Sequence, residues 1–332
     1  MSAKIAIDAM GGDNAPFEII KGTIDALKTM DFKALLVGDE VAISSELAKY
    51  EYNKDKIEII PSQSVIENCE QPTVAIKEKK DSSMVVALNL VKEGRADAII
   101  SAGNTGALLT GSTLIIGRIK GIKRPCLGVT LPTKKGYTLL VDCGANVDAK
   151  PENLLQFAQM GYVYYKEMFD KENTTVGLIN IGEEETKGNE QVKATYELLK
   201  NSSLNFIGNV EGRDIPLKGV DVVVADAFVG NVVLKTFEGL GKMFTDILKE
   251  SLTEKFLYKI GALLSMGALN NMRAKFDYKT IGGAPFLGLN SLVVKAHGSS
   301  DARAFKGAIN QCLKFKEKDI INKIAKNVQD VL

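Results

Sequence analysis

Short apolar runs alternate with longer segments of helical periodicity through the first third of the chain. The runs are four or five residues long, and each gives way to polar residues or glycine, which predicts buried strands joined by helices. The predicted strands are residues 4–8, 33–37, 56–60 and 98–101. The predicted helices are residues 17–30, a helix after residue 40, residues 73–80, residues 82–93 and a glycine-bearing helix that follows residue 101. This alternation is typical of a mainly parallel α/β sheet.

The clearest strand lies at residues 220–225, where the run VVVA follows Val220-Asp221. A strand without polar alternation is buried on both faces, as in a parallel sheet. The run stops at Asp226, and the pattern predicts a turn through Gly230-Asn231 before a helix. Ligands of α/β proteins bind where a strand end feeds a helix start, because free N–H groups there suit an anion. The same pattern also fits an ordinary connection.

The middle of the chain departs from this alternation. Residues 126–131 and 137–141 are apolar runs separated by PTKKG, a turn composition, which predicts an antiparallel hairpin inserted in the sheet. Alternation then resumes, and no flexible linker is visible. The later predicted elements are a helix at 154–169, strands at 175–180 and 205–208, a helix from 189, a strand at 291–294 and a last helix capped by Ser300 or Asp301. We therefore expect one domain, residues 1–332, of two interlocked subdomains.

A long helical segment follows Gly230, and we expect a helical hairpin at residues 237–275. Apolar side chains recur there at helical spacing, at Leu252, Phe256, Leu257, Ile260, Leu263 and Leu264. Such a stripe most often packs in a core or a dimer interface. The alternative is a helix that lies on a membrane surface.

Composition removes several classes of function. The 332 residues carry 42 basic and 41 acidic side chains, so bulk charge does not favour nucleic acid as a partner. The four cysteines form no CxxC pair, which indicates free thiols in a reducing cytoplasm and no zinc site. The first residues do not resemble a signal peptide, and no apolar stretch reaches the roughly 20 residues of a spanning helix. With a single histidine, His297, three-histidine metal sites and HExxH helices are excluded.

Polar, glycine-containing loops follow most of the predicted strands. These loops are DAMGGDNAP, SAGNTGA, DCGANVD, NIGEEETKGNE, GNVEGRD, DAFVGN and AHGSSD, and we expect them to gather along one edge of the sheet. They contain neither a Walker A motif nor GxGxxG, so a nucleotide is not indicated. They offer instead backbone N–H groups, asparagines and Lys187, which can bind an anion and stabilise an oxyanion. Phosphate attacking an acyl thioester is one reaction that such groups can support.

Other candidate groups have simpler interpretations. His297 can donate a hydrogen bond or move a proton, but it also fits a plain loop residue. Cys143 has no histidine near it in the sequence and is interpreted as a buried, inert thiol. Asp8, Asp142 and Asp226 end strands, and their spacing does not specify a metal.

The ordered motifs of the whole chain resemble the bacterial phosphate acyltransferase (PlsX) family. The resemblance covers residues 5–308. It is carried by IAIDAMGGDNAP, SAGNTGALL, RPCLGVTLPT, VDCGANVDAKPENLLQFAQMG, GLINIGEEETKGNE, FIGNVEGRD, DVVVADAFVGNVVLKTFEG and GGAPFLGLNSLVVKAHGSSDARAF.

The resemblance implies an activity and a set of partners. Family members transfer a fatty acyl group from acyl carrier protein to inorganic phosphate. For this chain we expect no cofactor and assign no metal site. A membrane acyltransferase then uses the acyl phosphate to acylate glycerol 3-phosphate. The implied fold is three-layer α/β/α, similar to isocitrate and isopropylmalate dehydrogenases and to phosphotransacetylase, with a protruding helical hairpin. The implied protein is a cytoplasmic homodimer in peripheral contact with the membrane, so membrane and dimer roles for the apolar stripe become equally plausible.

The resemblance also places candidate residues in this sequence. Lys187, Asn231 and His297 are the expected catalytic groups. The expected substrate- and phosphate-binding residues are Asp8, Gly11, Gly12, Asn14, Gly103, Asn104, Thr105, Asn146, Asn180, Asn189 and Asp226. Two positions depart from the family pattern, because Ala225 and Ala227 stand where cysteine and glycine are expected.

Two alternatives to this activity remain open. One is a phosphate acetyl- or butyryltransferase that uses acyl-CoA. The other is a non-catalytic lipid-binding scaffold.

Overall fold

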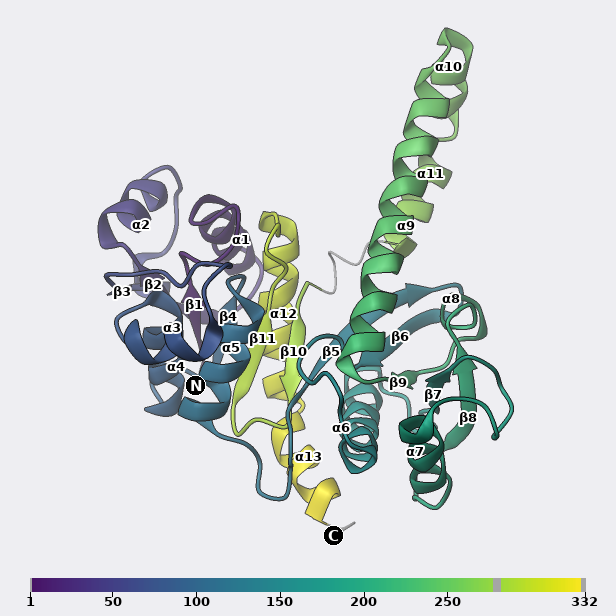
Figure 1. The fold of residues 1–332 in the computed structure, drawn as a ribbon. Coiled ribbons are helices and arrows are strands. Elements are labelled where there is room, and N and C mark those ends of the chain that lie inside the picture. The colour runs from purple at the N-terminus through teal and green to yellow at the C-terminus, as the bar shows by residue number, and fades with distance from the viewer. Residues whose placement is uncertain (1, 277–281, 330–332) are drawn as a thin grey trace.

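A single 11-stranded sheet extends through the residues that the computed structural model describes, 2–276 and 282–329 (Figure 1). The strand order is β3 (Ile57–Pro61), β2 (Phe32–Gly38), β1 (Ala3–Asp8), β4 (Ala98–Ser101), β11 (Leu292–Lys295), β10 (Ala284–Leu287), β5 (Cys126–Thr133), β6 (Gly136–Val141), β9 (Val222–Val224), β7 (Val176–Asn180) and β8 (Phe206–Glu211). Most neighbouring strands are parallel, as predicted.

Helices cover both faces of the sheet and enclose two hydrophobic cores. One core lies under α1 (Phe17–Leu27), α2 (Glu40–Leu47), α6 (Pro151–Phe169), α7 (Glu190–Lys200), α12 (Ala302–Glu317) and α13 (Ile320–Gln329). The other lies under α3 (Pro72–Glu78), α4 (Ser83–Lys92), α5 (Thr105–Gly111), the π-helical turn η2 (Ser112–Ile116), α8 (Ile215–Lys218) and the first turns of α9 (Ala227–Thr253). The short helix η1 (Lys54–Lys56) precedes β3. The predicted three-layer α/β/α fold is confirmed.

Strand β9 shows why the central strands are apolar at every position. Val222 and Val224 belong to one core, and Val223, between them, belongs to the other. Successive side chains of a strand point to opposite faces, so a strand covered on both sides needs apolar residues throughout.

Strand direction reverses three times in the middle of the sheet, at β11–β10, β10–β5 and β5–β6. The hairpin predicted around residues 132–136 is confirmed as β5 and β6, and β10 is antiparallel to both β11 and β5. These three antiparallel pairings separate two parallel groups, so β1, β4 and β11 run opposite to β6, β9 and β7. The expectation that all the glycine-containing loops follow one edge is therefore wrong, because parallel strands alone bring their carboxyl ends to the same edge.

Several predicted boundaries also differ from the structure. The strand expected at 220–225 is shorter, and α9 begins at Ala227, so Gly230 and Asn231 lie in a helix rather than in a turn. Strand β8 continues past 208 to Glu211, and β10, which contains Pro285, was not predicted. Of the two candidate caps for α12, Asp301 accepts the hydrogen bond from Ala304 N, at 2.9 Å.

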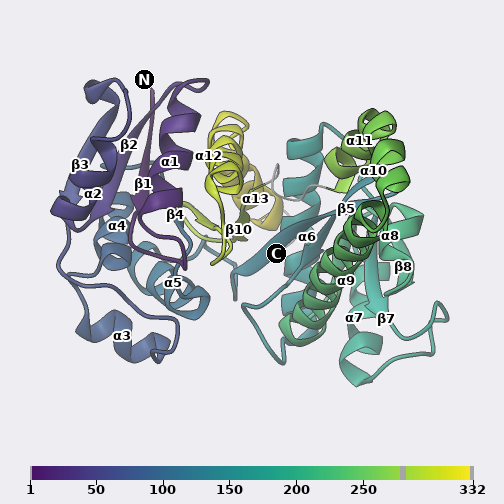
Figure 2. The ribbon, with the colours of Figure 1, turned by 90° about the horizontal axis from the view of Figure 1, so that it is seen from above.

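The predicted helical hairpin projects from the sheet. It consists of the distal part of α9, α10 (Phe256–Leu264) and α11 (Met266–Phe276), and it stands away from the body of the molecule in Figure 1; Figure 2 looks down on it from above. None of the α10 residues is buried, and Leu264 is 83% exposed. Of the predicted apolar stripe, Leu252 is half-buried and the others are exposed. None of the described helices combines the length and the apolar character needed to span a bilayer.

Candidate active site

Asp8, Ser101 and Lys295 end three neighbouring parallel strands and lie side by side in register. We call this set of strand ends, with the loops that follow them, the Asp8 edge. Ser101 Oγ donates to Asp8 Oδ2 at 2.6 Å and accepts from Gly103 N at 3.1 Å. Burial raises the pKa of Asp8, and the hydrogen bond from Ser101 opposes that rise. Asp8 is therefore a buried anchor for the loop after β4.

The predicted glycines of this edge permit close packing of its loops. A Cβ at Gly11 would lie 2.5 Å from Asp8 Oδ2, and Gly12 has a φ of +101°, a conformation that side chains disfavour. Asp13 N donates to Gly298 O at 2.8 Å, and Asn14 Nδ2 donates to Ser300 O at 3.3 Å. The loops after β1 and β11 thus hold each other in place.

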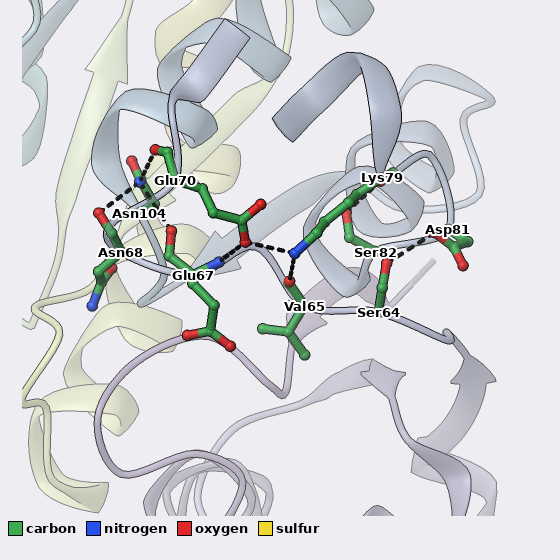
Figure 3. Close-up of polar contacts among 9 residues, drawn as sticks. All are labelled: Ser64, Val65, Glu67, Asn68, Glu70, Lys79, Asp81, Ser82 and Asn104. Atoms are coloured by element: carbon green, nitrogen blue, oxygen red, sulfur yellow. Dashed lines mark hydrogen bonds and ion pairs between the residues drawn. The ribbon is translucent and has the colours of Figure 1, made fainter. Parts of the chain in front are cut away.

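Asn104 uses both ends of its side-chain amide within the protein. Its Oδ1 accepts from Ala107 N at 3.0 Å and caps α5, which starts at the half-buried Thr105. Its Nδ2 donates to three carbonyl oxygens of the loop at 62–71, at 3.1–3.3 Å (Figure 3). Lys79 fastens the same loop through Glu70 Oε1 at 2.5 Å. Asn104 therefore braces this loop, a role that the sequence did not reveal.

Lys295 is a cation of this edge that the sequence analysis missed. Its Nζ donates to Ala102 O at 3.2 Å and to Ala296 O. Burial lowers the pKa of Lys295 to about 8, while Asp8 and Asp13 act in the opposite direction. The signal available in the sequence was a lysine placed directly after an apolar strand.

His297 follows Lys295 and faces helix α9. Ser299 N donates to His297 Nδ1 at 3.2 Å, so a neutral ring carries its proton on Nε2. That Nε2 lies 3.9 Å from Glu238 Oε1, and Glu238 also pairs with Lys235 at 2.8 Å. Burial lowers the pKa of His297, with the Glu238 carboxylate opposing the shift. The neutral form with a donor at Nε2 is therefore favoured at pH 7.

A second group of loops follows β6, β9 and β7, which are neighbours in register through Val141, Val224 and Leu178. We call it the Asp226 edge. Asp142 is buried here and accepts hydrogen bonds from the backbone of Leu127 and of residues 144–146, at 2.8–3.3 Å. Burial raises the pKa of Asp142. This carboxylate organises the loop from within.

Most of the predicted asparagines on the Asp226 edge also support the backbone. Asn146 Nδ2 donates to Asp142 Oδ2 at 2.8 Å, and Asn180 Nδ2 donates to Lys187 O at 3.1 Å. Asn189 and Asp226 cap α7 and α9, each through a 2.9 Å hydrogen bond. These side chains shape the loops.

Lys187 and Asn231 differ from the neighbouring polar residues. Both are exposed, and neither side chain makes a hydrogen bond or ion pair with another residue in the described part of the chain. A cation and an amide without protein partners are available to a ligand.

Helix α9 connects the two edges. It begins against the Asp142 loop, where a Cβ at Gly230 would lie 1.9 Å from Asp142 O. Asn231, Lys235 and Glu238 recur at spacings of four and three and so share one side of the helix. From Asp226 to Glu238 the helix advances about 18 Å. Asn231 is part of α9, and His297 lies beside the same helix at Glu238. Lys187 belongs to the Asp226 edge alone.

The sequence comparisons agree with one another over nearly the whole chain. A family model described as fatty acid synthesis protein matches residues 3–323. The phosphate acyltransferase of Clostridium beijerinckii is 52% identical over 324 residues, 97% of each chain. That of Clostridium botulinum strain Alaska E43 is 51% identical over 329 residues, 98% of this chain and 99% of the relative. The chain belongs to the phosphate acyltransferase family.

This phosphate acyltransferase is also similar in fold to solved structures of other enzymes. A phosphotransacetylase from Streptococcus pyogenes has a TM-score of 0.58 at 17% identity, covering 99% of this chain and 94% of that one. A 4-hydroxythreonine-4-phosphate dehydrogenase from Klebsiella pneumoniae has a TM-score of 0.52 at 12% identity, covering 95% and 97%. At these identities the phosphate acyltransferase shares the α/β architecture with both.

Proposed function

We propose that this enzyme transfers a fatty acyl group from acyl carrier protein to inorganic phosphate and releases an acyl phosphate. The observation that carries the proposal is the match of about 50% identity to phosphate acyltransferases over nearly the full length, together with the fatty acid synthesis family model.

The reaction needs few protein groups. A phosphate oxygen attacks the carbonyl carbon of the thioester and forms a C–O bond. The carbonyl oxygen becomes an oxyanion, and collapse of the tetrahedral intermediate breaks the C–S bond. The carrier's sulfur leaves with the electron pair as a thiolate. Two reactants must be positioned, and the oxyanion must be stabilised by donors.

We assign these tasks to three residues. Lys187 and Asn231 bind the phosphate or the oxyanion, which is supported by their exposure and by their lack of partners among the described residues. His297 donates from Nε2 to the thioester carbonyl, which is supported by the hydrogen bond from Ser299 N that holds the other ring nitrogen.

The surroundings of the enzyme complete the proposal. The protein acts as a homodimer, and the exposed apolar residues of α10 contact the membrane peripherally. The acyl phosphate then passes to a membrane glycerol-3-phosphate acyltransferase.

The test compares acyl donors and variants in one assay of acyl phosphate and free thiol. Wild-type protein should consume acyl-loaded acyl carrier protein faster than acyl-CoA at equal concentration. Lys187→Ala and Asn231→Ala should each lower kcat/KM on the order of 10²-fold, the usual effect of losing an oxyanion donor. Lys249→Ala, an exposed lysine on distal α9, serves as the control.

Each departure from this result has a distinct meaning. Preference for acyl-CoA would make the protein an acetyl- or butyryl-type enzyme. Absence of free thiol at any phosphate concentration would favour the non-catalytic scaffold. Wild-type rates in a folded Lys187→Ala protein would remove Lys187 from the site.

A further inference from the structure

The charge of this chain is unevenly distributed along the sequence. Residues 98–141 contain six basic side chains and no acidic one, although the whole chain is almost neutral. Four of the six, Arg118, Lys120, Lys123 and Arg124, fall within residues 117–125, the connection between η2 and β5. We call residues 117–125 the basic loop.

The basic loop is anchored to the body of the protein. Ile119 and Ile122 are buried, with 5% and 4% of their surface exposed. On α6, Gln156 accepts from Lys123 N at 2.9 Å and donates to Gly121 O at 2.8 Å. Ile119 N also donates to Gly288 O at 3.0 Å. The loop therefore has a fixed shape before any partner binds.

The four cationic side chains of the basic loop point to solvent without neutralisation. All four residues are exposed, and none forms an ion pair with an acidic side chain in the part of the chain that the structure describes. Arg118 donates to Lys123 O, which holds one end of the loop to the other. Uncompensated like charges repel each other, so the approach of an acidic surface stabilises a fixed cluster of this kind.

The basic loop adjoins the candidate active site through a short chain of contacts. Asn146 Nδ2 donates to Pro125 O at 2.7 Å, and Ala227 N donates to Asn146 O at 3.0 Å. Asn231 lies one turn further along α9, about 6 Å by helical rise. A molecule seated on the basic loop is therefore close to the Asp226 edge.

The position and composition of the loop bear on the kind of partner. In Figure 1 it forms the blue-teal connection at the lower side of the molecule, whereas the apolar hairpin ends at the top. A membrane contacted by the hairpin tip would lie away from this loop. The loop also has no aromatic residue on which a nucleotide base could stack.

We propose that the basic loop is the docking surface for the acidic carrier protein that delivers the acyl thioester. This assignment rests on the proposed function, which requires such a carrier. The cations steer the carrier and hold its acidic face, and the thioester arm then reaches past Pro125 and Asn146 towards Asn231.

The experiment reverses the charge of three loop residues in the variant Lys120→Glu/Lys123→Glu/Arg124→Glu. Arg118 is kept because it braces the loop. The matched control, Lys77→Glu/Lys80→Glu/Lys92→Glu, makes the same charge change at exposed positions of α3, its following turn and α4. Steady-state kinetics are measured with two acyl donors. One is acyl-loaded carrier protein, and the other is acyl pantetheine, a thioester that lacks the carrier protein. Binding of unacylated carrier is measured by calorimetry.

We expect the loop variant to have a KM for acyl-loaded carrier protein at least tenfold higher than that of wild type at low salt. Its kcat/KM for acyl pantetheine should be unchanged. The wild-type KM should rise with ionic strength, and that dependence should weaken in the variant because screening acts on the same charges. The control should behave as wild type. If the triple variant does not fold, Lys120→Gln/Lys123→Gln is expected to show a smaller change of the same sign.

Two results would overturn the docking surface while leaving the activity intact. One is wild-type KM and carrier binding in the loop variants. The other is unchanged carrier binding with lost binding to anionic phospholipid vesicles or to single-stranded RNA. Failure of wild-type protein to use any acyl carrier protein would instead refute the proposed function.

Discussion

At the scale of single residues, polar side chains near the strand ends divide into braces and free groups. Asn104, Asn146 and Asn189 each hold a loop or a helix start, whereas Asn231 has no partner among the described residues. The sequence predicts polar strand ends but not this division. The partners of Asn104 Nδ2 come from a loop 34 to 37 residues earlier, which no local pattern reveals.

Gly230→Ala should be far more damaging than an ordinary glycine substitution. Its Cβ would lie 1.9 Å from Asp142 O, so the start of α9 must move away from the loop. We expect a loss of about 1–3 kcal/mol in the free energy of unfolding, the usual cost of overpacking, measured by urea denaturation.

Gly239→Ala is the matched control for this prediction. It lies on the same helix with nothing within 4 Å of the added Cβ, so helix propensity should stabilise it by up to about 1 kcal/mol. Equal effects of the two substitutions would show that α9 does not press on the Asp142 loop.

Lys295→Met should stabilise the protein in a pH-dependent way. The pKa of Lys295 is about 8 in the folded protein, against about 10.4 for an unperturbed lysine. Between these values the unfolded chain binds a proton that the folded protein does not, so wild-type stability falls as pH decreases from 10.4 to 8 and the full penalty remains below 8. The Lys295→Met substitution should therefore raise the free energy of unfolding by at most about 3 kcal/mol at pH 7, since each pKa unit corresponds to about 1.4 kcal/mol.

The measurement is urea unfolding of both proteins at pH 7 and near pH 10.5, with the exposed Lys54→Met as control. The advantage of Lys295→Met should shrink towards high pH. A gain independent of pH would show that burial of the charge is not its origin. Sequence reasoning missed this lysine because its burial depends on β4, which pairs with β11 from a distant part of the sequence.

At the scale of elements, α9 combines two environments in one helix. Its start packs on the sheet, with Ala227 and Gly230 buried, and its distal half is exposed along with α10. The apolar periodicity predicts the helical hairpin, and the structure confirms that it projects. Strand reversal was not predictable in the same way, because β10 is short, contains Pro285 and pairs with strands distant in the sequence.

Phe256→Glu/Ile260→Glu should reduce sedimentation with phospholipid vesicles several-fold without changing Tm. Phe256 is 78% exposed and Ile260 42% exposed, so their replacement removes apolar surface from contact with lipid but not from the core. The measurement uses zwitterionic vesicles to limit charge repulsion.

Asn270→Asp/Asn271→Asp adds the same charge to exposed positions of α11 and should sediment as wild type. Unchanged sedimentation of the Phe256→Glu/Ile260→Glu protein, with its mass in solution halved, would assign this face to a dimer interface.

At the scale of the whole molecule, the continuous sheet ties the two halves together. One core contains Ile5 and Phe32 from the first strands together with Val176 and Val222 from the last group. We propose that the chain forms one cooperative domain of two interlocked subdomains, as the lack of a linker in the sequence led us to expect.

Urea unfolding should therefore follow a single transition. Far-ultraviolet circular dichroism and the fluorescence of the nine tyrosines, in a chain without tryptophan, should give the same midpoint. Two separate midpoints would show that the halves unfold independently despite the shared sheet.

The length of α9 has a mechanical consequence. With 27 residues the helix is about 40 Å long, and only its first turns are clamped against the sheet. If the helix moves as a rigid body, a tilt of its exposed half also moves the segment at Glu238, which faces His297. We therefore expect a partner that shifts the outer hairpin to change the orientation of the helix that carries Asn231.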